Sequence, residues 1–166
     1  VGTPFVVDDH MVAAEIDEGL VSQSASSVLM KLLYGARMAR FDLLKATNAL
    51  ARRITKWNVH CDKALFRLMC YVWHTRHHVL IGWVGDPIEL VMRLHFADGD
   101  YGAKIEFFKS TNGGFYAIVG IHTFFPIAPS CKKQTVIGGS TSEAEVVSLS
   151  YHVRSTLIPA SVIWDV

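Results

Sequence analysis

The chain has 166 residues, of which 51% are hydrophobic and 19% charged, and its formal net charge at pH 7 is +1. This length is enough for one domain, or for one small domain with a helical appendage. Because the net charge is close to zero, any nucleic-acid contact must use a local basic patch. Three cysteines without close pairing exclude a disulfide framework and predict a reducing, intracellular compartment, while the apolar surplus predicts a polyprotein fragment or a surface covered by partners.

Residues 1–25 predict an extended, partly ordered lead-in. We expect no secretory signal in the opening residues, because Asp8 and Asp9 follow the first apolar residues at once. Small polar residues between Ser22 and Ser27 could cap the helix that we expect next.

Residues 26–77 predict a helical connection segment. Apolar residues recur at helical spacing in 28–36, 41–56 and 62–74, so we expect a helix in each range. Basic residues on these helices could follow a nucleic-acid backbone, with Trp57 and Trp73 nearby for stacking, or could form solvated helix faces. The candidates are Arg37, Arg40, Arg52, Arg53, Lys56 and Arg67, together with the later pair Lys132 and Lys133.

A group of cysteines and histidines in the same segment raises the question of zinc. Cys70 and His74 are four residues apart on a predicted helix, so both could reach one ion. No Cys-x-x-Cys pair accompanies them, and Cys61 and Cys70 also fit a buried helix face, so we expect no zinc. The full group is His60, Cys61, Cys70, His74, His77 and His78.

Residues 78–166 alternate in the manner of strands and end in a helix. We expect strands at 78–83, 89–97, 115–119 and 123–128, turns at 85–87 and 109–114, a helix at 142–154, and Pro159 helping to end the element beyond it. The uncharged run 113–131 is interrupted by glycines and prolines, which favours a hairpin over a membrane span. The predicted fold class is α/β, with a helical N-terminal half, then three or four antiparallel strands and a helix.

Two acidic residues occupy positions that suit metal chemistry. Asp98 follows the alternating run Leu94–Ala97, and Glu145 lies near the start of the last predicted helix. Magnesium prefers oxygen ligands, and two ions about 4 Å apart can stabilise both the attacking water and the leaving oxygen of a phosphodiester. A turn at a strand end and an ordinary acidic helix start would produce the same residues.

The motifs occur in an order that resembles a known family. Residues 97–102 (ADGDYG), 131–134 (CKKQ) and 140–145 (STSEAE) are similar to motifs of the ribonuclease H domain in copia-type LTR retrotransposon polyproteins. Upstream, residues 33–44 (LYGARMARFDLL) resemble the segment that follows the reverse-transcriptase palm in those polyproteins. The resemblance covers roughly residues 26–165 and implies a C-terminally truncated ribonuclease H-like domain at 78–166.

This resemblance implies hydrolysis of RNA in RNA–DNA hybrids with magnesium bound by Asp98 and Glu145. Asp100 and Glu143 are second-rank metal candidates. The family's next aspartate, in an Asp-Asn pair on a later strand, has no counterpart here, so we expect little or no activity. The alternative is a structural or interaction subunit of a larger assembly, which could be membrane-associated.

The chain departs from the family at several positions. Ala97, Gly99 and Tyr101 replace other residues of the first motif, which are mild changes. Pro129 stands where the family has tryptophan, so the third strand must end early or lie at a sheet edge.

Overall fold

The computed structural model describes residues 2–4, 17–101 and 110–164. The chain divides into two compact units, Val1–Leu80 and Ile81–Val166, called here the helical unit and the sheet unit. The sequence-based boundary lies between residues 77 and 78. The fold is mixed α/β with a three-stranded antiparallel sheet, which confirms the predicted class at that level.

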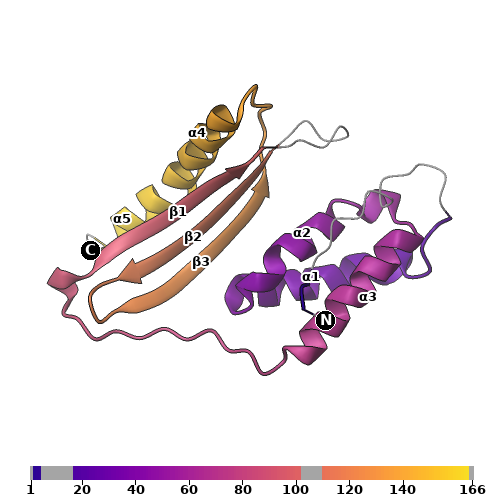
Figure 1. Cartoon of the computed structure of the whole chain (residues 1–166), viewed down its shortest axis with the longest axis horizontal. Coiled ribbons are helices and arrows are strands. Elements are labelled where there is room, and N and C mark those ends of the chain that lie inside the picture. The colour runs from indigo at the N-terminus through magenta and orange to yellow at the C-terminus, as the bar shows by residue number, and fades with distance from the viewer. Residues whose placement is uncertain (1, 5–16, 102–109, 165–166) are drawn as a thin grey trace. The chain divides into compact units, whose positions relative to one another are not determined.

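The helical unit contains α1 (Ser22–Met38), α2 (Leu44–Ala51) and α3 (Val59–His74), shown in Figure 1. Short 3-10 turns at Phe41–Leu43 and Ile54–Lys56 flank α2. The single helix predicted for 41–56 is therefore divided into three pieces. Trp57, which follows the last piece, has an extended backbone.

Both long helices begin earlier than the sequence predicted. The predicted lead-in to residue 25 is wrong at its end, because α1 starts at Ser22, and residues 5–16 lie outside the described ranges. The expected serine cap is absent at α1, where Val21 is the N-cap without a side-chain bond. Helix α3 starts at Val59 because the Asn58 side chain accepts a hydrogen bond from the Cys61 N–H at 3.0 Å.

The core of the helical unit consists of small and aliphatic side chains at helical spacing. Burial of these residues removes apolar surface from water, and each buried leucine contributes roughly 1.5–3 kcal/mol. The same pattern confirms that Cys61 belongs to a buried helix face. The buried set includes Ala25, Leu29 and Ala36 on α1, Leu44, Ala46 and Leu50 on α2, and Cys61, Leu65 and Leu68 on α3.

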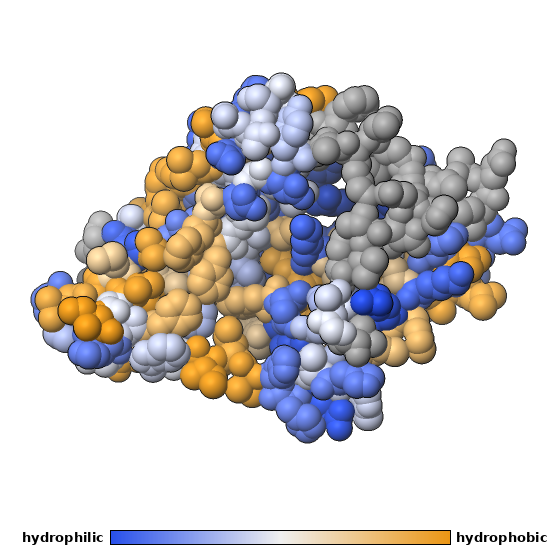
Figure 2. Space-filling view, viewed as in Figure 1, coloured by the Kyte–Doolittle hydropathy of each residue, from blue (hydrophilic) through white to orange (hydrophobic). Residues whose placement is uncertain are grey.

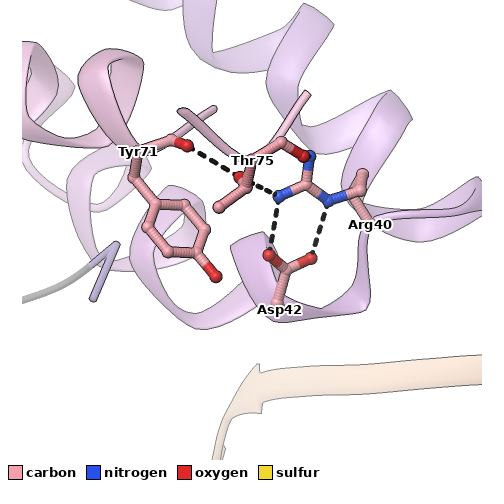
Figure 3. A network of polar contacts seen from close by, with 4 residues as sticks. All are labelled: Arg40, Asp42, Tyr71 and Thr75. Carbon is pink, nitrogen blue, oxygen red and sulfur yellow. Dashed lines mark hydrogen bonds and ion pairs between the residues drawn. The ribbon is translucent and has the colours of Figure 1, made fainter. Parts of the chain in front are cut away.

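A charged network joins the end of α1 to the end of α3 (Figure 3). The Arg40 guanidinium donates to both carboxylate oxygens of Asp42, at 3.0 and 2.8 Å, and to the Thr75 carbonyl oxygen at 3.0 Å. It also donates to Thr75 Oγ1 at 2.7 Å, and that hydroxyl donates to the Tyr71 carbonyl oxygen at 2.7 Å. Because every charge has a partner, the network can be half-buried without a large desolvation cost.

The sheet unit is built on β1 (Met92–Asp100), β2 (Thr111–Val119) and β3 (Phe124–Lys133), antiparallel in the order β1-β2-β3. These strands confirm the predicted adjacent antiparallel strands. The predicted strand at 78–83 is wrong, since only Trp83 pairs, through two backbone hydrogen bonds with Phe124. The predicted turn at 109–114 is also wrong where it is described, because Thr111–Gly114 belong to β2, and Lys109 lies outside the described residues.

Strand β3 lies at an edge of the sheet, as predicted from Pro129. A register shift at Tyr116 and Ala117 leaves Ile127 as an extra residue in β3, between Pro126 and Ala128. Prolines have no N–H to donate, so Pro126 and Pro129 are tolerated at an edge strand and beside a bulge.

Helix α4 (Thr141–His152) packs on one face of the sheet, and α5 (Ile158–Trp164) follows it on the same side (Figure 1). Ala144, Ser148 and His152 recur every fourth residue and are buried. A π-helical turn, Val153–Leu157, separates the two helices. Pro159 does not end an element as predicted; it lies in the first turn of α5, where a proline is tolerated, directly after the widened turn. None of the described helices has the length and hydropathy needed to span a membrane.

Candidate carboxylate site

Asp98 lies near the end of β1, opposite Gly113 of β2. Its side chain is exposed, and strand alternation directs it to the sheet face away from α4, beside the position of Gly113. Its carbonyl oxygen, by contrast, accepts a hydrogen bond of 2.7 Å from Ser148 Oγ on α4. The backbone of Asp98 is thus fixed to the helix while the carboxylate stays in solvent.

Gly99 brings the backbone of α4 against β1 immediately beside Asp98. A Cβ at Gly99 would meet the Ala144 carbonyl oxygen and would lie 2.8 Å from the Glu145 nitrogen. Only a residue without a side chain permits this approach. The two best metal candidates, Asp98 and Glu145, are therefore sequence neighbours of the residues in contact, and both side chains are exposed.

The second-rank candidates have different roles. Glu143 forms a capping box with Ser140: the Glu143 N–H donates to Ser140 Oγ at 3.2 Å, and the Glu143 carboxylate accepts from the Gly139 N–H at 2.7 Å. This carboxylate therefore serves the helix start. Asp100 is exposed at the end of β1, opposite Thr111, and alternation gives its side chain the same direction as Asp98.

The exposed carboxylates of this site are ligands of the kind that magnesium binds. Carboxylate oxygens are the ligands that the ion prefers, and two of them can hold it while it keeps most of its water. Within the described ranges, however, no group of three or more histidine, cysteine or acidic side chains could hold a metal ion. The Asp98 carboxylate is directed to the sheet face away from α4, which carries Glu145, so the structure does not bring these two carboxylates onto one ion.

The predicted basic residues belong to both units and have different surroundings. Arg40 is engaged in the network of Figure 3 and its side chain is only 15% exposed, so it has a structural role. Arg37, Arg52 and Lys56 are exposed and Arg53 is half-buried, all in the helical unit. In the sheet unit, the Lys132 ammonium lies 5.2 Å from the centre of the Tyr151 ring, on the α4 side, and Lys133 pairs with Thr111.

Two histidines that the sequence did not single out meet between β1 and α4. The ring centres of His95 and His152 are 4.8 Å apart, and His152 is fully buried. Burial lowers the pKa of both imidazoles, and for His95 the neighbouring His152 lowers the pKa further. A signal for His152 was present in the sequence, since it follows Ala144 and Ser148 on the same helix face; His95 had none beyond strand alternation.

The three cysteines form no disulfide: Cys61 is buried, while Cys70 and Cys131 are half-buried.

Comparison with protein-family models, with curated proteins and with solved structures found no match to this chain.

Proposed function

We propose that the sheet unit is a ribonuclease H-like module with little or no cleavage, which binds the backbone of an RNA–DNA hybrid through a hydrated magnesium ion at Asp98, while Glu145 on α4 is not placed to share that ion. One observation carries this proposal: the Asp98 carboxylate is exposed, while its backbone is fixed against α4 by Ser148 and by the close approach at Gly99. Three antiparallel strands followed by a helix on one face also agree with the first part of that fold.

Weak cleavage follows from the number of ligands. A single carboxylate holds a strongly hydrated ion poorly, and it leaves the charge that develops on the phosphate in the transition state insufficiently stabilised. Asp98, whose carbonyl oxygen accepts a hydrogen bond from Ser148, would position one hydrated ion beside a phosphate.

A labelled RNA–DNA hybrid tests the proposal with the purified chain. Fluorescence anisotropy should show magnesium-dependent binding that weakens about tenfold, or about 1.4 kcal/mol, in Asp98→Asn and changes little in Glu145→Gln. Glu143→Gln is the matched control, because it removes a charge two residues away while glutamine can still accept the Gly139 hydrogen bond. Denaturing gels of the same samples should show little or no RNA cleavage.

The possible outcomes are distinct. Robust cleavage that is lost in Asp98→Asn would mean that a further ligand, such as Asp100, completes an active centre, and the claim of weak cleavage would be wrong. Magnesium-independent binding that is equal in all three variants would remove the proposed role of the Asp98 carboxylate.

A second candidate function rests on the open face of the sheet, opposite α4. Rings of Phe96, Phe115, Phe124 and Trp83 form a row across it, with successive ring centres 6.3, 6.3 and 5.5 Å apart. Phe96 is 54% and Trp83 53% exposed, and Figure 2 shows apolar surface over much of the sheet unit. An exposed apolar row of this kind favours a structural or interaction subunit whose protein partner covers the sheet. This alternative gains if the hybrid assay shows no binding.

A further inference from the structure

The contact between His95 on β1 and His152 on α4 is a polar site within the interface between the sheet and α4. The two rings are tilted by 39° with their centres 4.8 Å apart. Gly114 on β2 makes room for the second ring, since a Cβ at Gly114 would lie 2.7 Å from His152 Cδ2. The sheet and the helix are thus shaped around the imidazole of His152.

The hydrogen bonds of the pair define its protonation in the packed state. His152 Nδ1 lies 2.9 Å from the Ser148 carbonyl oxygen, which can only accept, so Nδ1 carries the proton. In a neutral ring Nε2 is then unprotonated, and it is buried without a hydrogen-bond partner. Both ring nitrogens of His95 are likewise buried without a partner. Protonation of either ring would therefore place a charged N–H where nothing accepts it.

The groups that face the pair offer no compensating negative charge. From β1 comes Arg93, whose guanidinium lies 5.5 Å from the centre of the Trp164 ring of α5. From β2 and α4 come the phenols Tyr116 and Tyr151, with ring centres 5.9 Å from His95 and 5.1 Å from His152. From β3 comes Lys132, over the Tyr151 ring. The acidic side chains of β1 and α4 are all exposed, and Asp98 is directed to the opposite sheet face; they are Asp98, Asp100, Glu143 and Glu145.

We propose that His95 and His152 form an acid-sensitive clamp, which holds α4 on the sheet while both rings are neutral and releases it when they are protonated. Release would break the bond from Ser148 Oγ to the Asp98 carbonyl oxygen and separate Gly99 from Ala144. Mild acid would then dismantle the arrangement that carries Glu145. The clamp is independent of nucleic-acid binding, so it stands or falls separately from the proposed function.

The direction of the pH effect follows from proton binding. Both histidines have a folded-state pKa below the ordinary value of 6.5, because burial disfavours the charged ring. Below about pH 6.5 the unfolded chain therefore binds more protons than the packed unit. Stability is complete above this pH and is lost as the pH falls toward the folded-state pKa values. For each histidine that is protonated on release, a fall of one pH unit lowers the ratio of packed to released α4 by at most about tenfold.

The test uses the full chain between pH 7.5 and 5.5. Hydrogen exchange of the α4 amides, corrected for the pH dependence of the chemical exchange rate, should show protection falling by up to about a hundredfold per pH unit when both rings contribute. His95→Phe keeps a ring of similar size and should roughly halve this slope on a logarithmic scale. His122→Gln is the control, because His122 is exposed in the hairpin between β2 and β3 and should leave the slope unchanged.

Imidazole NMR titration of the unaltered chain provides a second measurement that needs no variant. Both His95 and His152 should titrate below 6.5, together with the loss of α4 protection. Titration of either ring at or above 6.5 would overturn the clamp, and so would α4 protection that does not change between pH 7.5 and 5.5. An equal slope in His95→Phe and in the unaltered chain would exclude His95 from it.

Discussion

The two units join their elements in opposite ways. In the helical unit, α1 and α3 are connected by Arg40 and Asp42, a charged pair in which each group has several hydrogen-bond partners. In the sheet unit, β1 and α4 meet through the backbone contact at Gly99 and through the rings of His95 and His152. Both ring nitrogens of His95 and Nε2 of His152 are buried without a hydrogen-bond partner. The contact in the helical unit keeps its charges when half-buried, and the contact in the sheet unit excludes charge. We therefore expect the Arg40–Asp42 contact to resist mild acid. Substitutions there should be costly only when they leave one charge without its partner.

The largest expected effect comes from filling the space at Gly99. Gly99→Ala should lower the free energy of unfolding of the sheet unit by about 2–3 kcal/mol, because the added Cβ meets backbone atoms of Ala144 and Glu145 that cannot rotate away. Gly113→Ala is the matched control, since its Cβ would lie 3.8 Å from the nearest atoms, which is ordinary contact. Urea unfolding followed by circular dichroism measures both; equal stabilities would contradict the close approach of α4.

A smaller effect is expected from removing the charge of Asp42. Asp42→Asn leaves the half-buried Arg40 without its ion-pair partner, and we expect a loss of about 1–2 kcal/mol, reduced from the cost of a fully buried pair by solvent. Lys31→Gln, an exposed change in α1, provides a reference for the loss of one surface charge. Thermal unfolding measures both variants, and a loss no larger in Asp42→Asn than in Lys31→Gln would show that the network adds no stability.

The pH dependence of the Arg40–Asp42 contact sharpens the contrast with the histidine clamp. Burial raises the pKa of Asp42, but hydrogen bonds from Arg40 and Tyr71 outweigh burial, and the pKa lies below its ordinary value of 3.8. A carboxylate with a lowered folded-state pKa contributes stability that is present above the unfolded value and is lost only as the pH falls through the folded value. Amides of α3 should therefore keep their protection between pH 7.5 and 5.5, while those of α4 lose it.

The smallest effect concerns the start of α4. Glu143→Ala removes the acceptor for the Gly139 N–H and should cost about 0.5–1 kcal/mol. Glu145→Ala, two residues further on, should be nearly neutral for stability, since Glu145 is exposed and outside the capping box. Thermal unfolding of the two variants side by side decides whether the two acidic residues have separate roles. A larger loss for Glu145→Ala would mean that Glu145 stabilises the fold.

Local sequence signals predicted the elements better than their contacts. Alternation around Leu94 and Phe96 predicted β1, and apolar spacing predicted α3, because these patterns reflect which side chains are buried. The start of α3 was missed although Asn58 is a good N-cap residue, and the Ser140–Glu143 capping box was taken for a possible metal ligand. Both signals were present in the sequence.

What lay beyond prediction depends on contacts between distant residues. Gly113 and Gly114 were expected to form a turn because glycine usually marks one, whereas Gly114 is needed to accommodate His152 from a helix far along the chain. The meeting of His95 with His152 has no local pattern. The candidate site residues Asp98 and Glu145 were chosen by resemblance. The reason for a glycine at position 99 is visible only in the structure, where a side chain would meet the backbone of α4.

The two edges of the sheet differ in how they would meet another polypeptide. Strand β3 has Pro126 and Pro129, which cannot donate, and the extra residue Ile127 interrupts its regular repeat. Strand β1 is free of proline and of register shifts, and among the described residues it pairs with β2 on one side only. Unpaired N–H and C=O groups on a regular outer strand are a template for adding a further strand, whether from the same polypeptide or from a neighbour. Growth of this sheet would therefore proceed from β1, and the prolines of β3 would prevent it from continuing in the other direction.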